Sequence, residues 1–316
     1  MSVERWEREF ASVLDRSDDS SIQVQPEPAP PRLRWTRAWV LLLPLGLAGA
    51  SGPLHLDRTL ESTASPRVSL SNLKGHVVVK GWDRAGIHVT STSLSPDIEV
   101  DIEQYPPTGA AEKIHFTTHI LSNQLNDKSA DYTLEIPLDS SLEIRNPEGS
   151  VRIERLRGEA SVDTVGGTIS VSDESGHLSV RTIGGDIEIV RPSGRVEANS
   201  ICGSVRIVNP SSERLRAVTT SGKIFYEGDF LPGGEYELSD YSGDTEVLTP
   251  QSASFELNAK TVRGKVAADP DIALTPKRHT AFRPLNSNSL FGTHNAGKAT
   301  LELTSFSGTI RIRRLP

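Results

Sequence analysis

The chain has 316 residues, of which 36% are hydrophobic and 24% charged, with 25 glycines, 20 prolines and a formal net charge of −7. This length is enough for one large or two ordinary domains, and the composition is typical of a polar, turn-rich β-protein. The acidic balance excludes the broad basic surface that nucleic-acid binding requires. The single cysteine, Cys202, excludes an intramolecular disulfide and a thiolate metal cluster.

The N-terminal region has the pattern of a membrane-targeting sequence. Residues 1–37 are charged and proline-rich, which predicts a disordered tail on the cytoplasmic side. The uncharged run AWVLLLPLGLAGASGPL (38–54) follows three arginines, Arg32, Arg34 and Arg37, and therefore predicts a membrane-targeting helix with its N-terminus inside. Residues 55–64 are expected to be a linker to the remaining domain.

Two interpretations of the run 38–54 stay open. As an uncleaved signal anchor, it would make a single-pass protein of the cytoplasmic membrane with an extracytoplasmic C-terminal domain. As a signal peptide, it would be cleaved near Ala50 and leave a periplasmic or secreted protein. We favour the anchor because 37 residues before the apolar run are far more than a signal peptide usually has.

Residues 65–316 contain an internal repeat. The segment TVGGTISV (164–171) returns 18 residues later as TIGGDIEI (182–189), and the pattern recurs around nine glycines. Apolar residues recur five positions before each glycine, and mostly β-branched residues recur two and four positions after it, which predicts two short half-buried strands per repeat. The repeat glycines are Gly75, Gly149, Gly167, Gly185, Gly203, Gly222, Gly243, Gly264 and Gly308.

A small hydrogen-bonding residue stands three positions before every repeat glycine. If the repeats stack, these side chains form a polar ladder that satisfies backbone groups where the chain turns a corner, and the glycine permits a positive φ or a close approach there. We therefore expect a structural ladder and no catalytic row. The ladder residues are Asn72, Asn146, Thr164, Thr182, Ser200, Thr219, Asp240, Thr261 and Ser305.

A repeat of about 20 residues with two strands predicts an all-β fold, a single-stranded parallel β-helix or β-solenoid of nine or more rungs. Two intervals interrupt the rhythm. The section between Gly75 and Gly149 predicts longer or irregular rungs, and residues 269–299 predict a long surface loop that interrupts the last rungs.

The chain resembles the bacterial putative-adhesin family of extracytoplasmic β-solenoid domains, whose function is largely undefined. The resemblance rests on VSLSNLKGHVVVKGWD (68–83), DYTLEIPLDSSLEIRNPEGSVRI (131–153) and the T-[VI]-G-G-x-I-x-[VI] rungs, and it covers roughly residues 65–312. It implies a right-handed parallel β-helix behind a membrane segment, and it supplies no catalytic motif.

Searches for a catalytic or metal site give weak candidates only. The sequence has no HExxH, GxSxG or P-loop motif, so we expect no cofactor. His115 and His119 lie four apart on a predicted strand, about 13 Å from each other, which is too far to share a metal. Asp186 and Glu188 are the one speculative catalytic pair, because residues two apart on a strand face the same way. Ser170 and Arg206 are expected to flank Glu188, which instead favours exposed ion pairs.

Three functions follow as hypotheses. The first is a non-enzymatic extracytoplasmic β-solenoid that acts as an adhesin-like binding domain or scaffold at the cell envelope, with an envelope protein or polysaccharide as partner and the segment 269–299 as the best candidate for a specific contact. The second is a polysaccharide-degrading β-helix that uses Asp186 and Glu188. The third is an envelope-sensing membrane protein that signals through the tail 1–37.

Overall fold

The computed structural model describes residues 54–93, 95–121, 128–276 and 288–316, which belong to one compact unit, Ala50–Pro316. Every regular element in these ranges is a β-strand. None of the described residues forms a helix of the length and apolarity needed to cross a membrane. The expected tail (1–37) and membrane segment (38–54) lie outside the described residues, except for Leu54, with which the first strand begins.

The strands form two sheets of 12 strands each, here called sheets A and B. In spatial order, sheet A consists of β1 (Leu54–Leu60), β4 (Ile87–Ser93), β7 (Ala130–Pro137), β3 (Val77–Trp82), β9 (Val151–Glu154), β11 (Ile169–Ser172), β13 (Ile187–Val190), β15 (Val205–Val208), β17 (Ile224–Glu227), β19 (Thr245–Thr249), β24 (Ile310–Arg314) and β21 (Val266–Ala268). Sheet B consists of β22 (Ser289–His294), β20 (Phe255–Thr261), β23 (Ala299–Ser305), β18 (Glu235–Asp240), β16 (Arg214–Thr219), β14 (Arg195–Ser200), β12 (His177–Thr182), β10 (Ala160–Asp163), β8 (Ser141–Arg145), β2 (Ser62–Ser71), β6 (Ala111–Ile120) and β5 (Ile98–Tyr105).

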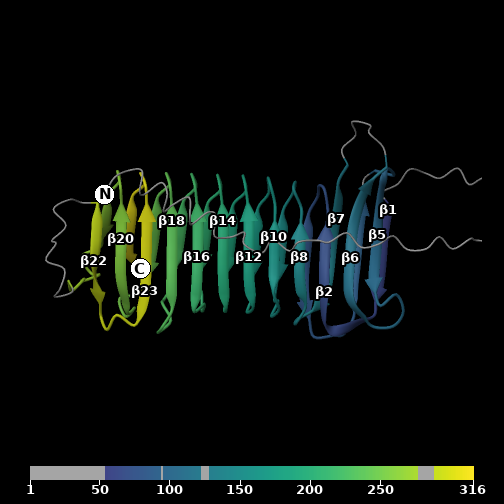
Figure 1. Ribbon diagram of the computed structural model, residues 1–316, viewed down its shortest axis with the longest axis horizontal. Coiled ribbons are helices and arrows are strands. Elements are labelled where there is room, and N and C mark those ends of the chain that lie inside the picture. The colour runs from purple at the N-terminus through teal and green to yellow at the C-terminus, as the bar shows by residue number, and fades with distance from the viewer. Residues whose placement is uncertain (1–53, 94, 122–127, 277–287) are drawn as a thin grey trace, which may run out of the picture. The chain divides into compact units, whose positions relative to one another are not determined.

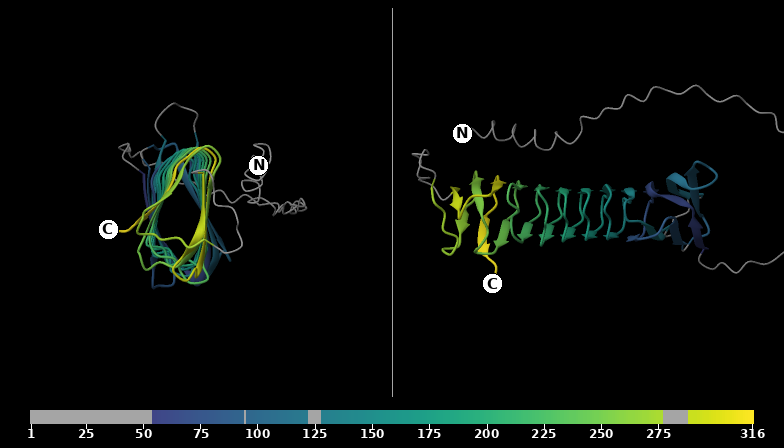
Figure 2. Two further views of the ribbon diagram at one scale, coloured as in Figure 1. Left: turned by 90° about the vertical axis from the view of Figure 1, so that its left-hand side faces the viewer. Right: turned by 90° about the horizontal axis from the view of Figure 1, so that it is seen from below.

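The chain coils between the two sheets and adds one strand to each sheet per turn (Figure 1). Viewed along the stack, the sheets face each other and successive turns superpose (Figure 2). From β8 to β19 all neighbouring strands are parallel and in register; Glu188, for example, pairs with Ser170 on one side and Arg206 on the other. The predicted all-β, parallel solenoid is confirmed.

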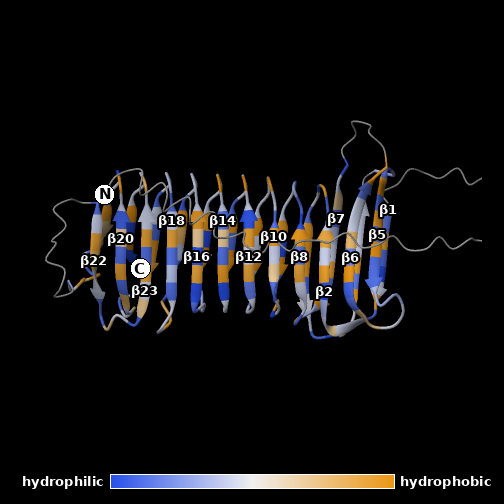
Figure 3. Ribbon diagram, viewed as in Figure 1, coloured by the Kyte–Doolittle hydropathy of each residue, from blue (hydrophilic) through white to orange (hydrophobic). Residues whose placement is uncertain are grey.

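The alternating sequence pattern fills the space between the sheets. In β11 and β13 the inward residues Ile169, Val171, Ile187 and Ile189 are at most 1% exposed, while the residues between them face outward. Figure 3 shows the same alternation as bands across the strands. Because burial of one such side chain contributes about 1.5–3 kcal/mol, the stacked apolar columns are the main source of stability.

The nine repeat glycines form a continuous column at the first corner, where the chain passes from sheet B to sheet A. A Cβ atom on any of the last eight in the stack would lie 1.5–2.0 Å from the carbonyl oxygen of the preceding glycine. Only Gly75 and Gly149 have a positive φ, 132° and 123°, so close approach explains this column better than conformational freedom does. The spatial order is Gly75, Gly149, Gly167, Gly185, Gly203, Gly222, Gly243, Gly308 and Gly264.

The ladder residues lie beside this column, and all nine are buried, at 0–7% exposed. Thr219 shows the bonding pattern: its Oγ1 accepts a hydrogen bond from Gly222 N (3.1 Å) and donates one to Gly203 O (3.1 Å). Ser200 and Thr261 join their own glycine to the neighbouring glycine of the column in the same way, whereas Thr164 Oγ1 has no hydrogen-bond partner among the described residues. Asn72 and Asn146 instead bond to each other, Nδ2 to Oδ1, at 3.1 Å. Burial leaves the ladder no surface for a ligand.

The second corner, from sheet A back to sheet B, uses left-handed residues. Arg155, Asp173, Arg191 and Asn209 stand at equivalent positions, with φ between 49° and 56°. This conformation costs a non-glycine residue about 1–2 kcal/mol. The guanidinium of Arg191 donates two hydrogen bonds to the Asp173 carboxylate, at 2.7 and 2.8 Å, which joins two rungs and lowers the pKa of Asp173.

At the N-terminal end, antiparallel strands cover the first rung. The strands β6 and β7 lie parallel to β2 and β3, and the antiparallel partners β5, β4 and β1 follow outward. The expectation that residues 55–64 form a linker is wrong, because β1 pairs with β4 along its whole length and β2 begins at Ser62. The side chain of Leu60 packs against the core and holds this segment in place.

At the C-terminal end, the rungs do not follow the order of the sequence. The last rung of the chain, β23 and β24, inserts between the β18–β19 rung and the β20–β21 rung. The expected surface loop 269–299 contains the strand β22, which pairs antiparallel with β20, while residues 277–287 lie outside the described part. Ile272 is buried and Leu274 and Leu290 pack against the core. The described parts of this segment therefore cap the end of the solenoid.

One buried carboxylate interrupts the apolar interior of the second corner. Glu174 stands where adjacent rungs place Leu156 and Pro192, and it is fully buried. Its Oε1 accepts a hydrogen bond from Gly176 N (2.6 Å), and its Oε2 has no hydrogen-bond partner among the described residues. Burial raises the pKa of Glu174 to about 7, more than the Gly176 N–H lowers it.

We predict that the replacement Gly185→Ala destabilises the fold by about 3 kcal/mol, because the new methyl group would overlap Gly167 O at 1.8 Å. The neighbouring Gly184→Ala is the matched control. A Cβ there meets nothing closer than Val165 O at 3.6 Å, so its effect should stay within about 0.5 kcal/mol. Urea unfolding followed by circular dichroism measures both, and equal midpoints for the two variants would contradict the close-approach explanation.

We also predict that Glu174 makes stability fall as the pH rises. Because folding raises the pKa of Glu174, the folded state binds this proton more tightly than the unfolded state. The resulting stabilisation is fully present below the ordinary pKa of 4.5 and is lost as the pH rises through about 7. Glu174→Gln should therefore increase the free energy of unfolding at pH 8 by on the order of 2 kcal/mol, with the gain shrinking toward pH 4.

The control for this measurement is Glu159→Gln. Glu159 is exposed, so this replacement removes a carboxylate that is not buried. Unfolding midpoints at pH 4, 6 and 8 decide between the outcomes. A Glu174→Gln variant whose stability parallels that of the wild type at all three values would refute the role of Glu174.

Candidate functional site

The structure places the speculative catalytic pair in exposed positions that are already bonded. Asp186 lies just before β13 and accepts a hydrogen bond from Ser204 N (2.7 Å). Glu188 lies in β13, with its carboxylate 3.7 Å from the Arg206 guanidinium. Both carboxylates therefore join neighbouring rungs, and neither lines the groove described below.

The other sequence candidates also lie on the surface. His115 and His119 both lie on β6, where His115 contacts Ser69 and His119 Nε2 lies 3.2 Å from an Asp101 carboxylate oxygen. Within the described ranges, no group of three or more His, Cys, Asp or Glu side chains is placed to hold a metal ion. Cys202 is exposed at the first corner.

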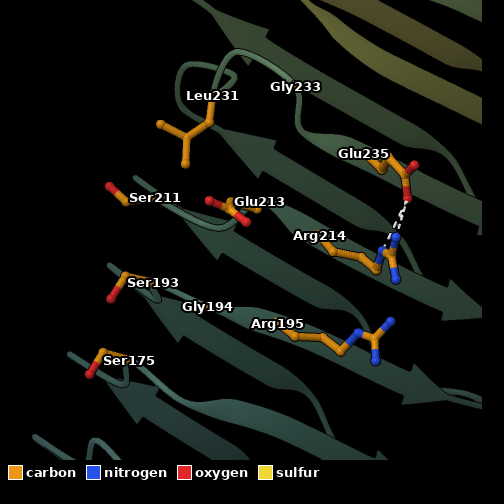
Figure 4. Close-up of a pocket in the computed structure, with 10 residues that line it drawn as sticks. All are labelled: Ser175, Ser193, Gly194, Arg195, Ser211, Glu213, Arg214, Leu231, Gly233 and Glu235. Atoms are coloured by element: carbon orange, nitrogen blue, oxygen red, sulfur yellow. Dashed lines mark hydrogen bonds and ion pairs between the residues drawn. The ribbon is translucent and has the colours of Figure 1, made fainter.

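The candidate site is a groove of about 660 Å³ at the second corner (Figure 4). Four successive turns build it: β11–β12, β13–β14, β15–β16 and β17–β18, together with the first residues of β14, β16 and β18. The repeat brings equivalent residues of these turns into columns. Its lining residues are Ser175, Ser193, Gly194, Arg195, Ser211, Glu213, Arg214, Leu231, Gly233 and Glu235.

Glycine at the turn lets neighbouring rungs approach closely beside the groove. Gly194 has φ 134°, and a Cβ atom there would lie 2.1 Å from Gly176 O, in the same way that one at Gly176 would overlap Gly158 O at 2.0 Å. This second, shorter glycine column lets the turns pack backbone to backbone.

One side of the groove is a column of three hydroxyl groups, from Ser175, Ser193 and Ser211 (Figure 4). Their backbone N–H groups bond to carbonyl oxygens of the preceding rung, at 2.9, 2.7 and 2.7 Å. Their side-chain hydroxyls make no hydrogen bond to any residue in the described ranges. The column therefore presents unused donors and acceptors to a ligand.

The other side of the groove is charged. The Arg214 guanidinium donates to the Glu235 carboxylate through Nε (3.0 Å) and Nη2 (2.9 Å), so this pair is neutral as a unit. Arg195 pairs in register with His177 on one side and Arg214 on the other. Within the part of the chain that the structure describes, neither Arg195 nor Glu213 has an ion-pair partner, and Figure 4 shows Glu213 between the serines and the arginines.

Sequence reasoning missed this groove, although a signal for it is present. The triplets SGH (175–177) and SGR (193–195) recur 18 residues apart, with SSER (211–214) in the next rung. They lie eight to eleven positions after the repeat glycines, beyond the offsets that carry the strand and ladder patterns. Read as columns, they place serine beside serine and charge beside charge.

No curated protein matches the chain. Solved structures that resemble it include a putative adhesin from Parabacteroides distasonis (11% identity, 84% of this chain and 98% of that chain, TM-score 0.43). Another is a putative adhesin from Bacteroides fragilis (11% identity, 83% of this chain and 97% of that chain, TM-score 0.36). A third is a putative cell adhesion protein from Clostridium sporogenes (10% identity, 84% of this chain and 100% of that chain, TM-score 0.31). The family model Toastrack DUF4097 matches residues 199–313. Over these residues the match agrees with the predicted resemblance to a putative-adhesin family of undefined function.

Proposed function

We propose that the chain is a non-enzymatic, adhesin-like binding domain at the cell envelope, and that the groove at the second corner is its ligand site. The proposal includes a right-handed coil and an extracytoplasmic position behind the segment 38–54, which either anchors the chain in the cytoplasmic membrane or is cleaved near Ala50. The partner is an envelope molecule that offers hydroxyl groups, above all a polysaccharide.

The observation that carries the proposal is the set of unused polar groups in the groove. Most outward charges of the solenoid have a partner within the molecule, as Arg206 has in Glu188 and Glu227, at 3.7 and 3.5 Å. In the groove, three serine hydroxyls, Arg195 and Glu213 have none, although the groove has the volume of a small-molecule site. Groups that are not needed for folding are available for a ligand.

The enzymatic alternative lacks such support. Glycoside cleavage generally needs two carboxyl groups about 5–10 Å apart on either side of one bond. Asp186 and Glu188 are engaged by Ser204 and Arg206. In the groove, Arg214 engages Glu235, which leaves Glu213 as the one lining carboxylate without a partner in the described structure. We therefore assign the groove to binding.

The remaining hypotheses also lack a favouring observation. The tail 1–37, on which envelope signalling would depend, lies outside the described residues. The segment 269–299, expected to make a specific contact, has a capping function in its described parts, with Ile272 3% exposed. Its removal should uncover the end of the core, so its deletion would not isolate a binding role.

The test uses the full-length chain and immobilised envelope polysaccharides, with retention and new reducing ends recorded in one assay. Ser193→Trp fills the groove from an exposed turn without changing the glycine column, so we expect at least a tenfold loss of retention and no new ends for any variant. The matched control is Ser170→Trp, which adds the same side chain to the outer face of β11.

Equal retention of the two tryptophan variants would show that the groove is not the ligand site. New reducing ends with the wild type would contradict the non-enzymatic assignment, whatever the retention. Circular dichroism of both variants confirms that each keeps its strands before retention is compared.

A further inference from the structure

We propose that the groove recognises a carboxylate-bearing saccharide, a uronate, and that Arg195 binds its carboxylate. The inference rests on the proposed function, because it takes the groove as the ligand site. It adds the chemical class of the ligand and the residue that selects it.

The fold leaves the charge of Arg195 without a partner. Neighbouring strands lie about 4.8 Å apart, and like charges directly opposite each other on a sheet are destabilising. Arg195 has Arg214 opposite it on one strand and His177 on the other, and no carboxylate within ion-pair distance in the described structure. Arginines of the described residues that pair with a carboxylate include Arg145, Arg152, Arg157, Arg191, Arg206, Arg214, Arg216, Arg311, Arg313 and Arg314.

An anionic ligand would remove this imbalance. A guanidinium binds a carboxylate through two parallel hydrogen bonds, which is a strong and directional interaction. Arg214 is less suited to that ligand, because the Glu235 carboxylate at its Nε and Nη2 already balances its charge. The one guanidinium lining the groove without a carboxylate partner in the described structure is that of Arg195.

The ligand must also satisfy Glu213 and the serines. An ionised carboxylate only accepts hydrogen bonds, so Glu213 calls for a donor such as a hydroxyl group. A small inorganic anion could pair with Arg195 but is too small to reach the serine column as well, and its charge would be repelled by Glu213. A neutral sugar supplies hydroxyls for Glu213 and for Ser175, Ser193 and Ser211 but leaves Arg195 without a partner. A uronate carries both groups on one ring.

The dimensions of the groove suit a short oligosaccharide. Four successive rungs line it, which corresponds to about 14 Å along the stack at the usual strand spacing. The hydroxyl column covers three of the four rungs, so consecutive rings can bond to Ser175, Ser193 and Ser211. Arg195 stands at one rung only, which predicts one dominant carboxylate contact within an otherwise hydroxyl-mediated interface.

The test compares the full-length chain's binding to polygalacturonate and to its methyl ester, which keeps the sugar but removes the charge. Polymers of glucuronate and mannuronate extend the panel. We expect the wild type to bind at least one acidic polymer tenfold or more tightly than its ester, since charged hydrogen bonds contribute more than neutral ones. Arg195→Gln should abolish this preference by lowering the affinity for the acidic polymer to about that for its ester.

The matched control is Arg145→Gln, which removes the same charge from an ion-paired residue on the same sheet, outside the groove. It should keep the preference for the acid. Rising salt should weaken binding of the acidic polymer by the wild type and have little effect on Arg195→Gln.

The proposal is overturned if no uronate binds, if esterification changes nothing, if Arg195→Gln behaves like the control, or if a zwitterionic peptide displaces the glycan at lower concentration. Ser193→Trp separates the two levels of the argument. When it abolishes retention while Arg195→Gln and esterification have no effect, the groove is the ligand site but the uronate assignment falls. If Ser193→Trp has no effect on retention either, both the ligand-site assignment and the uronate assignment are wrong.

Discussion

The close approach of one glycine to the next at the first corner is the constraint on which the solenoid depends. At Gly203, for example, the position of a Cβ atom is 1.7 Å from Gly185 O, so any side chain would push two rungs apart. The ladder residue Ser200 accepts a hydrogen bond from Gly203 N at 2.8 Å and faces Gly185 O at 3.4 Å. Together they fix the spacing and the register at one edge of every rung, and the two sheets follow from that edge.

Fixed register converts sequence offsets into surface columns. Residues at the same distance from their glycine lie side by side, as Ser170, Glu188 and Arg206 do on sheet A. This is why the sequence allowed these neighbours, the buried ladder and the alternating core to be predicted correctly. All three depend on contacts between equivalent positions of adjacent rungs, and the repeat spacing shows directly which residues occupy those positions.

The ends of the stack could not be predicted in the same way, since the repeats are interchangeable. The rung around Gly308 presents the same glycine, ladder serine and β-branched residues as the others, so it can stack on Gly243 as well as the rung around Gly264 can. The choice between them depends on β22, which needs an antiparallel partner in β20, and on Ile272, which must be covered. These are single long-range contacts with no period in the sequence.

The candidate groove was missed for a related reason. Periodicity identifies what the rungs share, whereas a binding site requires groups that the fold has not already used. Arg195 breaks the pairing of charges between neighbouring strands, and Glu174, one rung earlier, breaks an apolar column formed with Leu156 and Pro192. Both lie at the second corner, and Glu174 O accepts the backbone hydrogen bond of Ser193 in the groove wall, at 2.7 Å.

The two departures therefore adjoin each other, in the regular part of the stack between β8 and β19. The glycine column of the first corner runs through all nine repeats, whereas that of the second corner is shorter, so the longer column and the ladder hold the rungs in place where the second corner changes. The first corner of this fold is thus committed to stacking. The second corner contains strained left-handed residues such as Arg191 and Asn209, and its sequence can vary enough to form a ligand site.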